Sequence, residues 1–390
     1  MTQSDEMLVV KNGALVMCSD RAGDVKPDAE TGEGLYANDT RFLSELRLTV
    51  GGMSPIPLTA SADKAFEISI DASIPEVTTR NELSLSQTDL VLRRRRLVAD
   101  RVYERIEITN HGSASATTEL RVALSADFAD IFEVRRTQGL SFRQRKPALE
   151  HFEEGVAFEY AGLDDVVRRT KVTFDPAPAD LGMQGSRATA AWPIRLAPRQ
   201  SLVVDLVLEC SLGSDRSAHA SFDAAESACR EEAAGWVAGS TSIETSNHMY
   251  DRLIDATMRD LYALQTPMNG GRITAAGVPW YVAPFGRDAL WTSYECLMSR
   301  PDLARDTLLL LAEHQAHQDD AHRDAEPGKI LHELRAGELA GAGLVPHTPY
   351  FGTIDATPLF LVLAGAYYEW TGDVETMTRL KPHLEAALSW

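Results

Sequence analysis

The sequence has 390 residues, a formal net charge of -19 at pH 7, 24% charged residues and 44% hydrophobic residues. A chain of this length exceeds the size at which one hydrophobic core stops growing, so we expect two domains. The acidic balance argues against nucleic acid and anionic membrane surfaces as partners, because both attract positive charge.

Residues 8–212 have the pattern of β-strands. Apolar residues recur at every second position, which predicts one buried and one wet face for each strand. Turn signals such as Asn110-His111-Gly112 separate the runs. Short strands without intervening helical patterns predict an antiparallel β-sandwich. The alternating residues are Leu46, Leu48 and Val50; Phe66, Ile68 and Ile70; Leu120, Val122, Leu124, Ala126 and Phe128; and Leu202, Val204, Leu206 and Leu208.

Four consecutive arginines, Arg93 to Arg96, lie inside one of these strand patterns. Two of them should point to each face of the strand. We interpret them as a solvated, salt-bridged strand rather than as a basic recognition patch.

The character of the sequence changes after residue 212. Residues 213–245 are rich in Ala and Glu and predict a helical linker. Residues 246–390 predict α-helices with elaborate loops at their ends. We expect one helix after Ser246, which can cap its start, and two more that begin near Asp288 and near Pro301. A fourth helix should start after Thr357 as its cap and end at Gly372. The apolar stripes are Tyr250, Leu253, Ile254, Met258, Leu261 and Leu264; and Leu359, Leu363, Tyr367 and Trp370.

A last helical stripe, from Val374 through Met377 to Leu388, continues to Trp390 without a terminating signal. Four or five helices cannot easily close a layered domain around their own core. We therefore expect the chain to be the first part of a longer protein, with Leu380, Leu384 and Leu388 lacking the neighbours that should cover them.

An Arg-Asp pair, Arg287 and Asp288, stands between aromatic residues and a helical pattern in the stretch VPWYVAPFGRDALWTSYECL, residues 278–297. Asp288 alone could be a helix cap. With Trp280, Tyr281 and Phe285 in front of it, the pair also suits a sugar, which offers apolar faces for stacking and hydroxyls for hydrogen bonds. The residues leave both interpretations open.

Two further stretches hold charged and aromatic residues at predicted loops. GKILHELRAGEL, residues 328–339, contains His332, Glu333, Arg335 and Glu338, and the following loop adds His347, Tyr350 and Asp355. His314, His317 and His322 have no regular metal-ligand spacing, so we predict no metal site.

The remaining features predict a soluble cytoplasmic protein. Four scattered cysteines suggest no disulfide framework. The N-terminus lacks a signal-peptide pattern, and no apolar run approaches the roughly 20 residues that cross a bilayer.

Several motifs carry a family resemblance along essentially the whole chain. LYANDTRFLSELRLTVGG (35–52) and ADFADIFEVR (126–135) resemble the N-terminal domain of bacterial glycogen debranching enzymes, or amylo-α-1,6-glucosidases. PFGRDALWT, GKILHELRAGEL and YFGTIDATPLFLVLAGAYYEWTGD resemble the start of the same family's catalytic domain, an (α/α)₆ toroid of the six-hairpin glycosidase superfamily. The resemblance implies a β-sandwich at 8–212, a linker at 213–245 and the first part of a toroid at 246–390.

The resemblance also implies a substrate and a set of binding residues. It implies an α-glucan or oligosaccharide substrate, an inverting acid/base mechanism in the complete enzyme and no cofactor or metal. Asp288 matches a position that holds a glucosyl unit beside the cleaved bond. The family's general acid and base motifs are missing here, and we expect both after Trp390. The alternatives are a non-catalytic α-glucan-binding module and an inactive structural fragment. The expected substrate-binding residues are Trp280, Tyr281, Phe285, Arg287, Asp288, Trp291, His332, Glu333, Arg335, Tyr350 and Asp355.

Overall fold

The computed structural model describes residues 7–27, 32–75, 77–78, 84–85, 89–137, 145–213, 219–268 and 271–390. The chain divides into two compact units. Met1–Lys11 and Leu15–Cys229 form the first, here called the β unit. Asn12–Ala14 and Arg230–Trp390 form the second, here called the helical unit.

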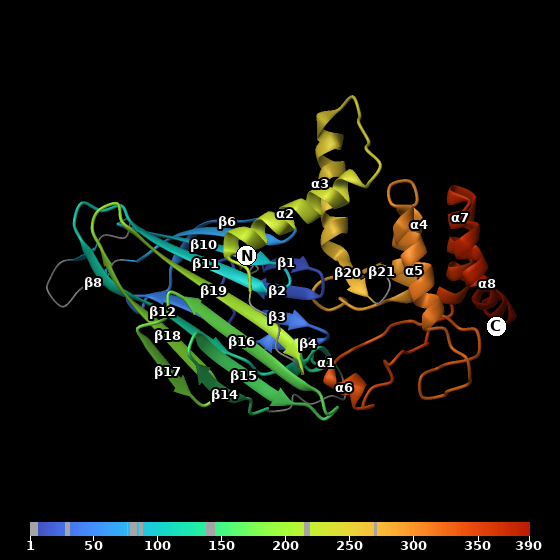
Figure 1. Ribbon diagram of the computed structural model, residues 1–390, viewed down its shortest axis with the longest axis horizontal. Coiled ribbons are helices and arrows are strands. Elements are labelled where there is room, and N and C mark those ends of the chain that lie inside the picture. Colours follow the sequence, from blue (N-terminus) through green and yellow to red (C-terminus); the bar gives the residue numbers. More distant parts are fainter. Residues whose placement is uncertain are drawn as a thin grey trace, which may run out of the picture. The chain divides into compact units, whose positions relative to one another are not determined.

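Two antiparallel sheets form most of the β unit (Figure 1). Among the described residues, one sheet has eight strands in the order β14-β15-β16-β19-β11-β10-β7-β6 and the other has four in the order β17-β18-β12-β5. The strands of the first are β14 (Ala148–Phe152), β15 (Gly155–Ala161), β16 (Val167–Asp175), β19 (Ser201–Leu212), β11 (Val102–Asn110), β10 (Leu90–Val98), β7 (Glu67–Ser73) and β6 (Ile56–Lys64). Those of the second are β17 (Asp180–Gln184), β18 (Arg187–Leu196), β12 (Ala116–Ser125) and β5 (Glu45–Val50).

One hydrophobic core fills the space between these two sheets. Phe174 of β16 meets Trp192 of β18 edge-to-face, with ring centroids 5.5 Å apart, so side chains of the two sheets are in direct contact. Leu120, Val122 and Leu124 are fully buried on the inner face of β12. The inward positions of β5, β7, β12 and β19 are the ones that the alternating pattern predicts. The predicted antiparallel sandwich is therefore confirmed.

Smaller elements complete the described part of the β unit. A five-stranded sheet has the order β1-β2-β3-β4-β13, and helix α1 follows its last strand. A two-stranded sheet joins β8 to β9. Their bounds are β1 (Leu8–Asn12), β2 (Leu15–Ser19), β3 (Gly34–Ala37), β4 (Thr40–Leu43), β13 (Ala129–Asp130), α1 (Ile131–Val134), β8 (Val77–Thr78) and β9 (Ser84–Leu85).

The arginine run on β10 is only half solvated, so the predicted solvated strand is wrong for two of its four side chains. Arg94 and Arg96 are each 2% exposed. Both bind the buried carboxylate of Glu104 on β11, at 2.6 and 2.5 Å. Asp24 adds a second carboxylate, 2.6 Å from Arg94. Burial would raise the pKa of Glu104, but the two guanidinium groups outweigh it and lower that pKa.

The helical unit has a hydrophobic core of its own. Helices α4, α5, α7 and α8 contribute most of its buried side chains, among them Leu290, Leu308, Phe360 and Leu380, and the connecting segments add others such as Ile330 and Leu331. The elements of this part of the chain are α2 (Phe222–Ala238), α3 (His248–Leu264), β20 (Gln265–Met268), β21 (Gly271–Thr274), α4 (Gly286–Glu295), α5 (Pro301–Glu313), α6 (Glu338–Gly341), α7 (Ala356–Thr371) and α8 (Val374–Ser389).

Two expected helix caps are wrong. Asn247, not Ser246, caps α3 by accepting a hydrogen bond from the Met249 N–H. Asp355, not Thr357, is the N-cap position of α7. Gly372 does close α7, in the left-handed conformation that glycine favours.

Two of the predicted apolar stripes are covered unevenly. Leu380 is 1% exposed, so the expectation that it lacks neighbours is wrong, and Leu384 packs partly against the same core. Leu388 is 72% exposed, as expected. On α3, Leu261 is buried whereas Tyr250 and Leu253 are each 60% exposed.

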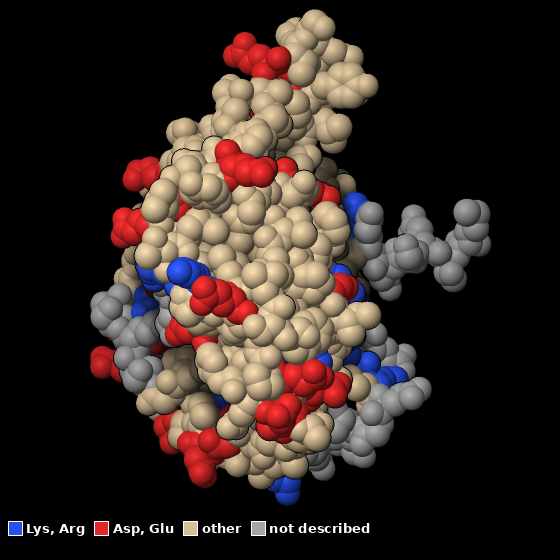
Figure 2. Space-filling model, turned by 90° about the vertical axis from the view of Figure 1, so that its right-hand side faces the viewer, with Lys and Arg blue, Asp and Glu red and all other residues tan. Residues whose placement is uncertain are grey.

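The surface reflects the acidic composition. Figure 2 shows acidic side chains scattered over one face, with fewer basic ones among them. Within the described residues, no helix is both long and apolar enough to cross a membrane.

Candidate functional site

Three segments of the helical unit pair through their backbones at the start of α4. Phe285 forms a bridge with Glu333, which forms another with Tyr350. The Gly286 N–H donates to the His332 carbonyl (2.9 Å), and the His332 N–H donates to the Tyr350 carbonyl (2.7 Å). These bonds bring residues that are far apart in the sequence to the same end of one helix.

Gly286 is what allows the close approach. A Cβ at this position would collide with the carbonyl oxygen of Leu331 and press on Ala356. Only a residue without a side chain lets the segment before Glu333 run against the first turn of α4.

A line of rings crosses the three segments. Tyr281 meets Phe285 with ring centroids 5.7 Å apart, and Phe285 meets His332 at 5.8 Å. His332 meets Tyr350 at 6.1 Å. All three contacts are edge-to-face, an arrangement that aromatic pairs favour.

A buried ion cluster lies beside these rings. Glu333 is 8% exposed and contacts Arg335 at 3.0 Å and His347 at 2.8 Å. Burial alone would raise the pKa of Glu333, but the His347 hydrogen bond and the Arg335 charge outweigh it and lower that pKa. Arg335 also lies 5.1 Å over the Phe285 ring and donates to the Trp280 carbonyl at 3.2 Å. Glu333 is thus held as a carboxylate in a fixed position.

A second ion pair joins the starts of two helices. Arg287 of α4 lies 3.3 Å from Asp355, the N-cap residue of α7. Asp355 also accepts a hydrogen bond from the Thr353 hydroxyl. Partial burial would raise the pKa of Asp355, but the bonds from Thr353 and Arg287 outweigh it and the pKa is lowered. This pair is more open to solvent than the Glu333 cluster.

Asp288 differs from the other two carboxylates. It occupies the third position of α4 and is half-buried. Phe285 is the N-cap residue, and no side chain caps this helix, so the interpretation of Asp288 as the cap is wrong. Within the described residues, its carboxylate has no hydrogen-bond or ion-pair partner. The first turn of α4, where Asp288 lies, is also the positive end of the helix dipole.

The remaining predicted residues lie around this framework. Trp291 is one turn after Arg287 on α4, is 48% exposed, and contacts Tyr294 edge-to-face. Trp280 is half-buried and takes part through its carbonyl oxygen. The structure thus links Trp280, Tyr281, Phe285, His332, Glu333, Arg335 and Tyr350 in one cluster and Arg287 with Asp355 in a pair.

Two residues of the cluster were not among the predicted binding residues. His347 holds Glu333, and Asp324 accepts a hydrogen bond from the Tyr350 hydroxyl at 3.1 Å. Burial and Asp324 together raise the pKa of Tyr350. Asp324 stands in the acidic loop HQDDAHRDAEPGK, where composition alone does not separate it from its acidic neighbours.

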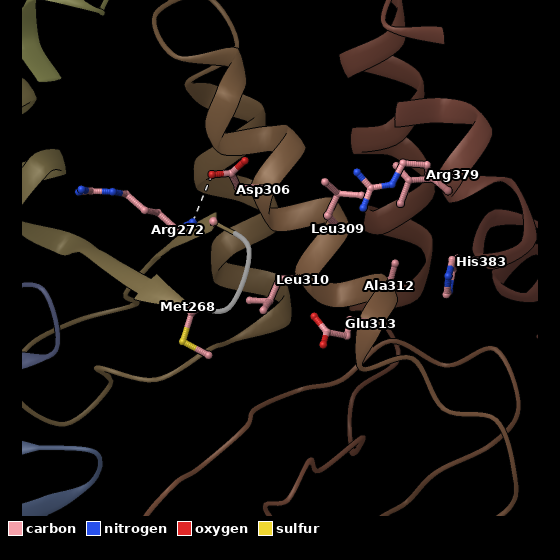
Figure 3. Close-up of a pocket in the computed structure, with 11 residues that line it drawn as sticks. Met268, Arg272, Asp306, Leu309, Leu310, Ala312, Glu313, Arg379 and His383 are labelled. Atoms are coloured by element: carbon pink, nitrogen blue, oxygen red, sulfur yellow. Dashed lines mark hydrogen bonds between the residues drawn. The ribbon is translucent and has the colours of Figure 1, made fainter. Parts of the chain in front are cut away.

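A cavity of about 340 Å³ lies elsewhere in the helical unit (Figure 3). It is lined by residues of β20, β21, α5 and α8, and by none of the predicted binding residues. Its Asp306 accepts from the Arg272 N–H at 3.2 Å, and the Arg272 guanidinium binds Glu232. No group of three or more potential metal ligands occurs in the described part of the chain.

Comparison with known proteins identifies the family. Residues 10–207, just over half of the chain, match the family model of the N-terminal domain of some glycogen debranching enzymes. This chain belongs to that family. No curated protein matches this sequence.

One solved structure supports the fold class of this chain. A structure described as "Putative kojibiose phosphorylase from human microbiome" has a TM-score of 0.60 at 9% identity, over 97% of this chain and 56% of that chain. The chain thus spans just over half of that protein's length. Two further solved structures are less similar. The Slr1438 protein from Synechocystis sp. PCC 6803 has 8% identity, coverage of 54% and 96%, and a TM-score of 0.36. A galactose mutarotase-like protein from Lactobacillus casei ATCC 334 has 8% identity, coverage of 53% and 100%, and a TM-score of 0.32.

Proposed function

We propose that the helical unit binds a glucosyl unit of an α-glucan and that the complete enzyme hydrolyses the bound glucan as an amylo-α-1,6-glucosidase. The half-buried Asp288 carboxylate, which has no partner among the described residues, is the observation that carries the proposal. Membership of the debranching-enzyme family supports the choice of a sugar ligand.

The chemistry around Asp288 suits a sugar. A carboxylate can accept hydrogen bonds from two adjacent hydroxyls, and a bond to a charged group is stronger than a neutral one. Arg287 beside it can donate to a ring or hydroxyl oxygen. The exposed ring of Trp291 on the same helix offers a flat apolar surface for the sugar's C–H face.

The other two carboxylates suit binding better than proton donation. In an inverting glycosidase, one carboxylic acid protonates the leaving oxygen while a second carboxylate activates water, and the acid has a raised pKa. The pKa values of Glu333 and Asp355 are lowered instead. We therefore propose that both are ionised acceptors and framework residues, with the catalytic acid and base supplied by other residues of the complete enzyme.

The test is the affinity of the chain for isomaltose, panose and maltotriose, measured by titration calorimetry. Asp288→Asn keeps the shape of the side chain but removes its charge, so affinity should fall by about 1.5–3 kcal/mol. Asp260→Asn, on the exposed surface of α3, is the matched control and should leave affinity unchanged. Unchanged affinity in Asp288→Asn would remove the basis of the proposal.

A further inference from the structure

The outer face of the eight-stranded sheet carries a second cavity, of about 320 Å³. All its lining residues belong to the β unit, and none belongs to the site described above. It lies over β11, β19 and β16, and His219 to Phe222 form one of its walls. Its size is that of a small-molecule site.

Strand register explains how the cavity is built. Tyr103 is paired with Val207, and Val207 with Thr173, so these three form one row across β11, β19 and β16. All three are less than 9% exposed and form a floor that is mostly apolar. Two residues further along the strands, on the same face, Asp205 is paired with Asp175.

The next row on this face, Arg105, Asp205 and Asp175, has more acidic than basic side chains. Arg105 donates to both oxygens of Asp205, at 2.8 Å each, and to Asp223 at 2.7 Å. Asp175 stands directly opposite Asp205, where like charges destabilise a sheet. Neither Asp175 nor the nearby Glu154 has an ion-pair partner among the described side chains. The guanidinium of Arg105 is thus already occupied and leaves both carboxylates open.

The side chains that line the cavity indicate which class of ligand it can bind. They offer hydrogen-bond acceptors, so a ligand must bring donors, and an anion would be repelled. Hydroxyls of Ser221 and Thr173 add neutral groups, and the His219 ring is fixed by contacts with Thr173 and the Ala220 carbonyl. A sugar unit has the hydroxyl donors for the rim and a C–H face for the floor.

We propose that this cavity on the outer face of the eight-stranded sheet binds a neutral sugar unit of an α-glucan, with Asp175 and Glu154 as acceptors. The choice of α-glucan rests on the proposed function. The cavity would then hold the glucan at a position other than the Asp288 site.

The experiment measures the affinity of the full chain for maltotriose by titration calorimetry. The unchanged protein is compared with Asp175→Ala, with Asp288→Asn and with the double variant. Asp175→Ala removes a charged hydrogen-bond acceptor, so it should weaken binding at this cavity, here called the sandwich site, by at least about 10-fold. Ala220→Trp, at the exposed wall of the cavity, should block the same site by bulk. Asp180→Ala, on β17, removes an exposed carboxylate outside the cavity and should change nothing.

The outcomes separate the two proposals. Two binding events, one lost in Asp175→Ala and Ala220→Trp and the other in Asp288→Asn, support both. A single binding event that is lost only in Asp288→Asn overturns the sandwich site and leaves the proposed function standing. A single binding event that is lost only in Asp175→Ala and Ala220→Trp overturns the proposed function. Absence of any binding overturns both. Binding at the cavity that occurs only with amines and disappears between about 50 and 500 mM salt would also overturn the sugar assignment, because ion pairs are screened and neutral sugar contacts are not.

Discussion

Glu333 accepts hydrogen bonds from Arg335 and His347 while almost fully buried. Removing one partner of a buried ion pair leaves the other charge uncompensated, which costs about 3–5 kcal/mol. We predict that Glu333→Gln lowers the free energy of unfolding of the helical unit by about 3 kcal/mol near neutral pH. Urea unfolding followed by tryptophan fluorescence would measure it.

The same residue predicts a pH dependence. The pKa of Glu333 is lowered in the folded chain, so its contribution is complete above the unfolded value of about 4.3. It is lost as the pH falls through the lower folded pKa. The stability difference between the unchanged protein and Glu333→Gln should therefore shrink below about pH 4. A difference that stays constant from about pH 7 to about pH 3 would contradict the assignment of the lowered pKa.

Glu104 gives the corresponding prediction for the β unit. It lies between Arg94 and Arg96 and is 1% exposed. Glu104→Gln should lower the unfolding free energy by about 3 kcal/mol or more, because two buried guanidinium groups lose their shared carboxylate. Glu107→Gln, on the opposite face of the same strand, should change it by no more than about 0.5 kcal/mol. Equal effects from the two substitutions in urea unfolding would show that burial of the cluster is unimportant.

The arginine run also shows what a sequence pattern omits at the residue scale. Period-two spacing correctly predicts that Arg94 and Arg96 share a face of the strand. Whether that face is wet depends on the side chains of the neighbouring strand. Arg96 is paired with Glu104 through the register of β10 and β11, which the pattern of one strand does not contain.

At the scale of helices and strands, Gly286 is a position where one methyl group should matter. Its Cβ would collide with the Leu331 carbonyl, so Gly286→Ala should separate the start of α4 from the segment that carries Glu333. We expect lower stability and weaker sugar binding. Gly365→Ala on α7 is the control: nothing lies within 4 Å of its added Cβ, and it should stabilise the chain by about 0.5–1 kcal/mol. Thermal unfolding should show a lower midpoint temperature for Gly286→Ala and a higher one for Gly365→Ala. A raised midpoint in Gly286→Ala would contradict the close packing.

The starts of the helices are also hard to predict from local sequence alone. Apolar periodicity predicts that α3, α4, α5, α7 and α8 exist, but capping preference misplaces some of their starts. Thr357 is a good cap by residue type. In the structure its hydroxyl instead accepts a hydrogen bond from the Ile330 N–H at 2.9 Å. A tertiary contact therefore uses the group that local propensity would assign to the helix end.

At the scale of the whole molecule, sequence patterns predict the order of an antiparallel sandwich followed by helices, because each depends on local periodicity. The candidate site depends on contacts between distant segments. No pattern in GKILHELRAGEL indicates that Glu333 pairs with Phe285 on one side and Tyr350 on the other. The family resemblance associates these motifs with one another, and the structure supplies their backbone bonds.

The chain as a whole should bind sugar but release no glucose from isomaltose, panose or a branched limit dextrin. Glu333 and Asp355 have lowered pKa values, so near neutral pH neither is the protonated acid that glycosidic cleavage requires. Proton transfer by one positioned group contributes roughly 10²–10⁴-fold. If other residues of the complete enzyme supply the acid and the base, as we propose, this chain should lack most of the rate acceleration. Glucose release is compared with a heat-killed sample from about pH 4 to about pH 8. Release that disappears when Asp288, Glu333, Glu338 or Asp355 is changed to its amide would show that these carboxylates cut the bond as well as bind the sugar.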